Sequence, residues 1–252
     1  MSLAVVGTDT GVGKTVVSAL ILARYGGAVL DGMGPAARRP GGGDPNGPPA
    51  RLAYWKPIST GAERDRDSIF VRTRVGDLAD VLDETYRFNP PVSPHLAAQR
   101  AGVEIEMERL VSTWQTIRAV PGRHLLVEGI GGALVPLNAK GVYLADFIGK
   151  LRVPVLVIAR TALGTINHTL LTLEALRKRR MSPVGVVLNG PPRAGTREAI
   201  EEFGKTRVID EVGPLVGGEN PSRAAIISAA PAFDAAGILA EYLATPAGAA
   251  DG

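Results

Sequence analysis

A glycine-rich segment near the amino terminus, Val5 to Thr15 with the sequence VVGTDTGVGKT, constrains the fold of this chain more than any other feature. It lies between a short apolar run, Leu3–Val6, and a stretch with helical spacing of apolar residues, Thr15–Arg24. A strand–loop–helix unit of this kind directs backbone N–H groups and the positive end of the helix dipole toward one point, which suits a phosphate group. The sequence therefore predicts a phosphate-binding loop of the P-loop type.

Two side chains at the end of the loop fit this interpretation. Lys14 is placed to reach the β- and γ-phosphates of a nucleotide, and the Thr15 hydroxyl is placed to bind Mg²⁺. The strict motif has glycine where this chain has Thr8, and here the glycine stands one position earlier, at Gly7. Because strand, glycines, Gly-Lys-Thr and helix coincide, we prefer a phosphate loop over a glycine turn without a ligand.

Apolar runs alternate with helical patterns along the rest of the chain. The further expected strands are Leu52–Trp55, His124–Val127, Val155–Ile158 and Val184–Leu188, and the further expected helices are Met107–Arg118 and Thr165–Arg179. Several runs lack polar alternation, which is typical of strands covered on both faces. The pattern predicts an α/β fold of the P-loop NTPase type, with a doubly wound, mostly parallel sheet flanked by helices.

The domain organisation predicted from the sequence is simple. Residues 1–243 are expected to form one domain, with a flexible Gly/Pro-rich insertion at 26–50 and a disordered tail at 244–252. A short strand at Ala28–Leu30 within the insertion is the alternative.

Composition excludes several classes of chemistry. The chain has no cysteine, which excludes disulfides, thiolate metal sites and cysteine nucleophiles. Its net charge of +3, without a long basic run, favours small anionic ligands and does not require nucleic acid. No apolar stretch is long enough to span a membrane, and we expect a cytoplasmic protein without a membrane partner.

Charged residues stand at two further strand ends. Lys56 follows the run Leu52–Trp55, and Glu128 follows His124–Val127 ahead of a glycine-rich turn. Ligands bind at the carboxyl ends of strands in open α/β sheets, so Lys56 is placed to meet the ligand that Lys14 holds. Glu128 occupies the position of the second metal-side acid of P-loop enzymes.

Together these segments resemble the dethiobiotin synthetases, over about residues 3 to 240. The segments that carry the resemblance are Gly7–Thr15, Lys56-Pro57 with Gly61, Ser93-Pro94-His95, Val127–Gly132, Leu163–His168, Asn189-Gly190 and Glu219-Asn220-Pro221. The resemblance implies a ligase of biotin biosynthesis that uses ATP and Mg²⁺. It would join CO₂ to 7,8-diaminononanoate through a carbamate and a carbamic-phosphoric anhydride, giving dethiobiotin, ADP and phosphate. It also implies a homodimer.

The resemblance also implies roles for individual residues. The nucleotide and its metal would be held by Gly11, Val12, Gly13, Lys14, Thr15, Val16, Asp67, Glu128, Gly129, Ile130, Gly131, Asn189, Gly190, Pro214, Leu215 and Val216. The metal would be surrounded by Thr15, Asp67 and Glu128, with Asp65 as the alternative to Asp67. The catalytic lysines would be Lys56 and Lys14, and the substrate would contact Thr60, Gly164, Thr165, Ile166 and Asn167. Ser222 stands where an acid of the family can contact the ribose.

The main alternative is a nucleotide-switched partition or positioning ATPase. Such proteins resemble this loop but carry a second lysine where this chain has Asp9. A cobyrinate amide synthetase-like domain, fused to a glutaminase with a catalytic cysteine, is less compatible with a chain without cysteine. The sequence leaves open the nucleotide preference, the dimer interface and a family member that binds nucleotide without turnover.

Overall fold

The computed structural model describes residues 2–26, 51–61 and 67–244. The insertion and the tail expected from the sequence lie outside these ranges, apart from Gly26 and Ala244, and so does the alternative strand at Ala28–Leu30. Asp65, the alternative metal-side acid, also lies outside. The single domain at 1–243 stays a prediction.

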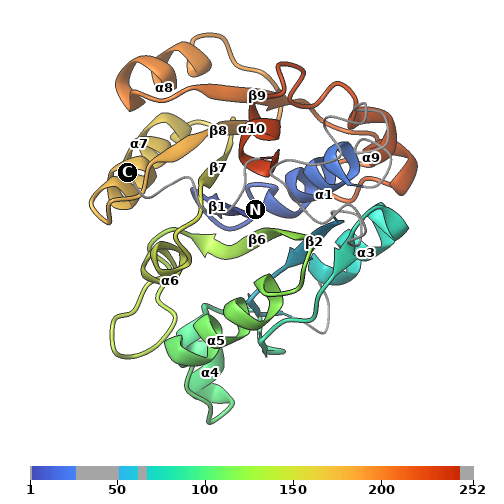
Figure 1. Cartoon of the computed structure of the whole chain (residues 1–252). Coiled ribbons are helices and arrows are strands. Elements are labelled where there is room, and N and C mark those ends of the chain that lie inside the picture. The colour runs from blue at the N-terminus through green and yellow to red at the C-terminus, as the bar shows by residue number, and fades with distance from the viewer. Residues whose placement is uncertain (1, 27–50, 62–66, 245–252) are drawn as a thin grey trace.

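A sheet of seven strands in the order β4-β2-β6-β1-β7-β8-β9 forms the centre of the molecule (Figure 1). The strands are β1 Ser2–Gly7, β2 Arg51–Trp55, β4 Asp80–Val81, β6 Arg123–Gly132, β7 Val155–Arg160, β8 Pro183–Asn189 and β9 Val208–Val212. All their pairings are parallel, and β3 Ile58–Ser59 with β5 Tyr86–Arg87 forms a small parallel pair beside them. The strand order reverses beside β1, which puts the loop after β1 at the usual ligand position of such sheets.

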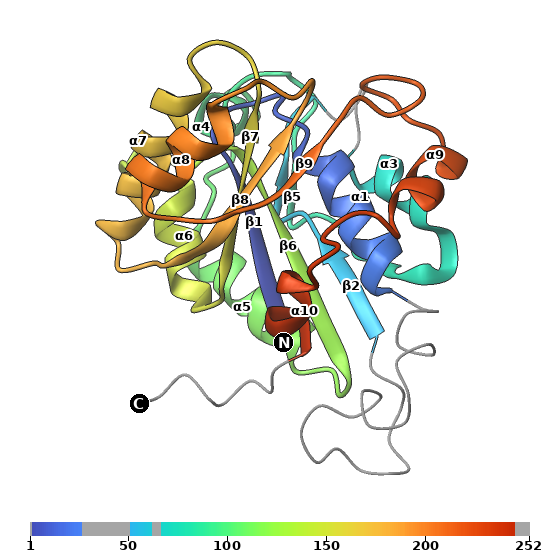
Figure 2. The same ribbon diagram turned by 90° about the horizontal axis from the view of Figure 1, so that it is seen from above.

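Helices cover both faces of the sheet (Figure 2). One layer contains α1 Lys14–Tyr25, α3 Asp67–Val75 and α9 Arg223–Ala229. The other contains α4 Pro94–Arg100, α5 Met107–Arg118, α6 Leu144–Leu151, α7 Thr165–Arg177 and α8 Thr196–Gly204. The short helix η1 Gly76–Leu78 follows α3, and α10 Ile238–Ala244 contacts β1. The prediction of a doubly wound α/β sheet is confirmed.

Alternation along β2 divides its side chains between two apolar cores. Leu52 and Tyr54 belong to the core under α1 and α3, whereas Ala53 and Trp55 belong to the core on the opposite face. Trp55 is fully buried and stacks on Trp114 of α5 with ring centroids 6.4 Å apart. It also contacts the Phe147 ring of α6 edge-on. This aromatic packing anchors the end of β2 immediately before Lys56.

The five strands and three helices expected from the sequence are present, with shifts of one or two residues at their ends except in β6. The prediction of a glycine-rich turn after Glu128 was wrong, because β6 continues to Gly132 and pairs with β1 at Gly7. Glycine allows this continuation, since a Cβ at Gly132 would lie 3.2 Å from the Thr8 carbonyl oxygen. Helix α7 ends at Arg177, two residues earlier than expected.

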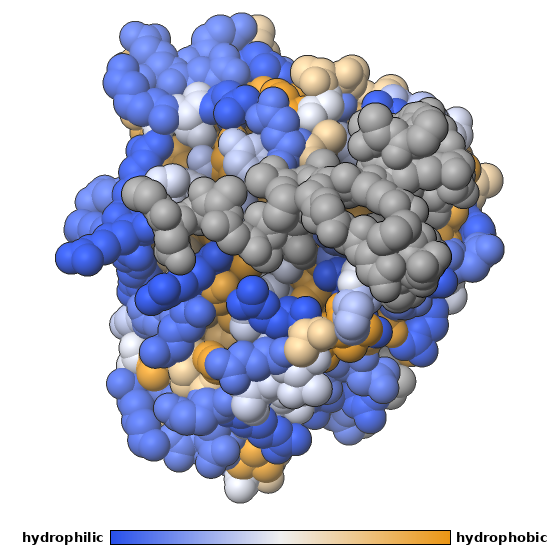
Figure 3. All heavy atoms as spheres, viewed as in Figure 1, coloured by the Kyte–Doolittle hydropathy of each residue, from blue (hydrophilic) through white to orange (hydrophobic). Residues whose placement is uncertain are grey.

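Among the described residues, no helix has the length and apolar character needed to cross a membrane. On the face seen in Figure 3, hydrophilic residues predominate and hydrophobic ones form scattered patches.

The aromatic cluster gives a prediction about stability. Trp114→Ala should lower the free energy of unfolding by about 3–5 kcal/mol, because it leaves a cavity against Trp55. Gln115→Ala, on the exposed side of the same helix, is the matched control and should change it by less than about 0.5 kcal/mol. Urea unfolding of both variants measures the difference, and equal midpoints would show that α5 does not anchor β2.

Candidate functional site

The loop after β1 has the backbone shape that a phosphate loop needs. Gly11 and Gly13 adopt positive φ angles of 72° and 88°, and Gly13 directly precedes α1. A Cβ at Gly13 would lie 2.0 Å from the amide nitrogen of Asn189, so only glycine fits there. Asn189 in turn donates a hydrogen bond of 3.1 Å to the Val12 carbonyl oxygen. The family resemblance implies that Asn189 contacts the nucleotide, which stays a prediction, and in the structure its side-chain amide nitrogen holds the loop.

Lys14 is buried in this loop, and no carboxylate of the described residues forms an ion pair with it. It is 7% exposed, and its Nζ donates to the Asp9 carbonyl oxygen at 3.0 Å. Burial and the neighbouring charge of Lys56 lower the pKa of Lys14 to about 8, although Glu128 and Asp67 act in the opposite direction. A phosphate group at this position would supply the missing negative charge.

A cluster of four side chains lies beside the loop, where β2 ends next to the middle of β6. The Lys56 ammonium donates to Glu128 Oε1 at 2.9 Å and forms an ion pair with Asp67. The Thr15 hydroxyl lies 2.8 Å from Asp67 Oδ1 and 2.9 Å from Glu128 Oε1. Lys56 is 3% exposed and Glu128 is fully buried. The structure brings these four residues together, and the roles predicted for them stay predictions.

Charge pairing favours the charged forms of Lys56 and Asp67. Burial acts to lower the pKa of Lys56, but the charges of Glu128 and Asp67 outweigh it and raise that pKa above its ordinary value. Burial acts to raise the pKa of Asp67, but Lys56 and the Thr15 hydroxyl outweigh it and lower that pKa. The result is two carboxylates and a hydroxyl around one small volume, with one ammonium between the carboxylates.

Sequence reasoning missed two hydroxyls that belong to this neighbourhood. Ser18 is fully buried in α1 and donates to Glu128 Oε2 at 2.8 Å, so both oxygens of this carboxylate are held. Tyr54 is also fully buried and lies two residues before Lys56 on β2. The sequence contained a signal for each: Ser18 is one helical turn after Thr15, and Tyr54 shares a strand face with Lys56.

The expected substrate contacts lie at the same edge of the sheet. Gly164 precedes α7 with a φ of 91°, and Thr165 begins that helix with its side chain 4% exposed. The Thr165 hydroxyl donates to the Arg160 carbonyl oxygen, so it is already engaged. Ile166 is half-buried and Asn167 exposed. In the described part of the chain, neither this helix start nor Thr60 has a hydrogen bond or ion pair with the Lys56 cluster.

The last segment that the resemblance assigns to nucleotide binding follows β9. Pro214, Leu215 and Val216 lie in it, and Val216 is 84% exposed. Arg74 of α3 ties the loop down, because it donates to the Pro221 carbonyl at 2.8 Å and to the Asn220 side chain at 2.7 Å.

Ser222, which stands where an acid of the family can contact the ribose, caps α9 instead. Its hydroxyl accepts a hydrogen bond of 3.2 Å from the Ala225 N–H.

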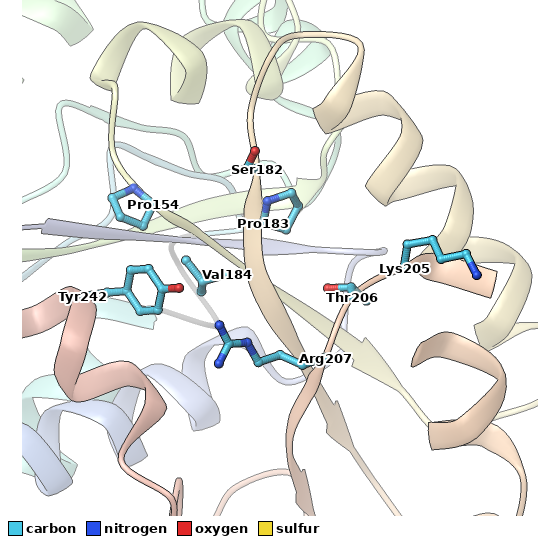
Figure 4. A pocket seen from close by; sticks show the side chains of 8 residues that line it. All are labelled: Pro154, Ser182, Pro183, Val184, Lys205, Thr206, Arg207 and Tyr242. Carbon is cyan, nitrogen blue, oxygen red and sulfur yellow. The ribbon is translucent and has the colours of Figure 1, made fainter. Parts of the chain in front are cut away.

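A separate cavity of about 380 Å³ lies at the opposite edge of the sheet (Figure 4). It is formed by residues at the amino ends of β7, β8 and β9 and by Tyr242 of α10. The polar ends of Arg207 and Tyr242 point toward each other, whereas Lys205 points away. Because the phosphate loop follows the carboxyl end of β1, this cavity is not part of the site described above.

Comparisons of the structure with solved proteins bear on the fold. The chain is similar to a ParA family ATPase from Chlorobium tepidum, with a TM-score of 0.56 and 10% identity over 94% of this chain and 97% of that chain. The MinD cell division protein of Aquifex aeolicus matches with a TM-score of 0.53 and 14% identity over 92% and 95%. Identities this low establish a shared fold and leave the function open.

Comparisons of the sequence bear on the family. The family model for an AAA domain matches residues 48–221, a range that begins after the phosphate loop. An ATP-dependent dethiobiotin synthetase of Paramagnetospirillum magneticum is 39% identical over 84% of this chain and 87% of its own length. The ATP-dependent dethiobiotin synthetase of Nitrobacter hamburgensis is 41% identical over 84% and 87%. The chain therefore belongs to the family of the ATP-dependent dethiobiotin synthetases.

Proposed function

We propose that this protein closes the ureido ring of dethiobiotin from 7,8-diaminononanoate, CO₂ and ATP. The observation that carries the proposal is the cluster of Lys56, Thr15, Asp67 and Glu128 beside the phosphate loop, in a chain whose relatives are named as dethiobiotin synthetases. Phosphoryl transfer depends mainly on positioning and on positive charge around the phosphate oxygens. The two buried lysines supply that charge at the carboxyl edge of the sheet.

ATP is the nucleotide that fits the loop and the family. Lys14 is buried and donates to a neutral carbonyl, so a triphosphate would replace a weak partner with an anionic one. The amides of the loop and the first turn of α1 would bind the phosphate oxygens. This support concerns the phosphates, and the residues that read the base are proposed from the family resemblance.

The oxygens of Thr15, Asp67 and Glu128 fit a bound Mg²⁺. Each hydroxyl has one proton, so Thr15 cannot donate to both carboxylates at once, although both lie within 2.9 Å. Hard divalent cations prefer oxygen ligands of this type, and a bound Mg²⁺ would neutralise charge on the phosphates. In the structure, Lys56 lies between the same two carboxylates and forms an ion pair with each, so its ammonium offsets part of their negative charge.

Lys56 is the residue proposed to act on the reacting groups. From its position between Asp67 and Glu128, its ammonium would turn toward the carbamate and the transferred phosphoryl group, where negative charge develops. At the other end of the substrate, the amides at the start of α7 would bind the carboxylate. Thr60 is also proposed to contact the substrate.

The proposed reaction is tested by measuring phosphate release in the presence of ATP, Mg²⁺ and bicarbonate. We expect phosphate release to depend on 7,8-diaminononanoate, and mass spectrometry should detect dethiobiotin in equal amount. Slow hydrolysis that is indifferent to the diamine would contradict the proposal and favour a nucleotide-switched ATPase of the partition type.

The role of Lys56 gives a sharper prediction. Lys56→Ala should lower turnover by about a hundredfold or more while ATP affinity stays within a few-fold, because the ammonium acts on charge that develops in the reaction. Lys140→Ala is the matched control, since that lysine is 72% exposed and pairs with Glu104. Steady-state kinetics and nucleotide titration of both variants measure the effect, and unchanged turnover in Lys56→Ala would remove this residue from the mechanism.

A homodimer is proposed as the working form. Two exposed leucines at the carboxyl edge support it: Leu163 is 92% exposed and Leu134 is 51% exposed. Both follow strands that flank β1, so a second copy covering them would lie close to the site.

Sedimentation measures this assembly directly. We expect a dimer that Leu163→Asp weakens, because a charge would be buried against the second copy. Leu171→Asp, at a 55% exposed position farther along α7, should leave the dimer intact. A monomeric native protein would contradict the proposal.

A further inference from the structure

The hydroxyl of Tyr54 is buried and has no hydrogen-bond partner among the described residues. The whole side chain is fully buried in the core beneath α1 and α3. Burying a hydroxyl without a partner costs free energy, and phenylalanine would fill the same space without that cost. The hydroxyl is therefore buried without a well-formed hydrogen bond in this state.

The position of Tyr54 places this hydroxyl on the face of the sheet that carries the acidic side of the site. Tyr54 pairs with Leu126 of β6, and Glu128 is two residues farther along that strand, on the same face. Burial, and after it the negative charges of Glu128 and Asp67 and the approach of the hydroxyl to the Glu128 carboxylate, raise the pKa of Tyr54. The phenol is thus a protonated donor beside the Glu128 carboxylate, but the two do not form a hydrogen bond of regular geometry here.

The Glu128 carboxylate has room for one more donor. Its Oε1 accepts from Lys56 and lies 2.9 Å from the Thr15 hydroxyl, whereas its Oε2 accepts from Ser18. A carboxylate has about four lone-pair sites, so Oε2 keeps one unfilled. If Lys56 turns to the substrate, Oε1 also loses its ammonium while the carboxylate stays buried.

We propose that Tyr54 is a positioning residue whose hydroxyl donates a hydrogen bond to Glu128 when Lys56 turns from that carboxylate toward the substrate. This inference rests on the proposed function, because it assigns Lys56 to the reacting groups. The bond would hold Glu128 in the orientation in which it faces Thr15 and the bound cation. A partner that orients a metal-side ligand commonly changes metal affinity or activity by 10- to 100-fold.

Tyr54→Phe tests the proposal, because it removes only the hydroxyl. We expect the unfolding midpoint of the ligand-free protein to stay unchanged or rise. Binding of Mg²⁺ with ADP should raise the unfolding midpoint. At saturating ADP, the Mg²⁺ concentration needed for half of this rise should be about tenfold higher in the variant. Turnover should fall by a similar factor, while the KM for ATP at saturating Mg²⁺ stays within about twofold.

Tyr25→Phe is the matched control. The Tyr25 hydroxyl donates to Asp234 in a buried contact outside the site, so its loss leaves a buried acceptor with one partner fewer. This variant should lower the unfolding midpoint and leave the Mg²⁺ dependence and the turnover unchanged. Tyr54→Phe is therefore expected to change the Mg²⁺ dependence and the turnover without loss of stability, whereas Tyr25→Phe is expected to lose stability only.

Two results would overturn the proposal. One is a lower unfolding midpoint of ligand-free Tyr54→Phe, as expected for Tyr25→Phe. The other is a Tyr54→Phe variant whose midpoint shift keeps the native dependence on Mg²⁺ concentration. The midpoint shift does not require turnover, so it separates this proposal from the proposed reaction. If the native protein released no diamine-dependent phosphate, the reaction would be rejected, while the shift would still support or reject the role of Tyr54.

Discussion

The buried pairing of Lys56 with Glu128 and Asp67 is the interaction on which the site depends. Removing charged groups from water costs several kcal/mol for each ion, and the cost is offset only when the partners are held in good geometry. Here neighbouring strands supply Lys56 and Glu128, while α1 and α3 supply Thr15 and Asp67. The sheet and one helical layer must therefore be in place before the charges can be buried together.

Strand alternation explains how the same short segment serves both the core and the site. Trp55 points into the core between the sheet and α5, where its packing fixes the end of β2. Tyr54 points to the opposite face, beneath α1 and α3, and Lys56 follows toward the acidic residues. A change in the register of β2 by one residue would exchange these faces, so apolar packing also determines where the ammonium lies.

The fold by itself does not choose between the two functions that the phosphate loop suggested. ParA and MinD proteins share this fold at 10% and 14% identity, whereas the synthetases match at about 40% identity over most of the chain. The difference lies in the site, since a fold can carry several activities. Asp9, where the switch-type proteins carry lysine, pairs with Arg160 at 3.7 Å and so belongs to the local charge arrangement of this protein.

The sequence by itself determined the order of the main strands and helices, because buried strands and a glycine loop before a helix leave strong local patterns. It also indicated Lys14, Thr15, Lys56 and Glu128, since each stands beside a recognisable strand or loop end. Short elements such as β9 and α9 were missed because their residues lack a clear period. Only the tertiary structure placed Asp67 against Lys56, put Ser18 on the second oxygen of Glu128 and buried the Tyr54 hydroxyl without a well-formed hydrogen bond to any described residue. These facts depend on contacts between residues far apart in the chain, and local sequence patterns do not encode such distances.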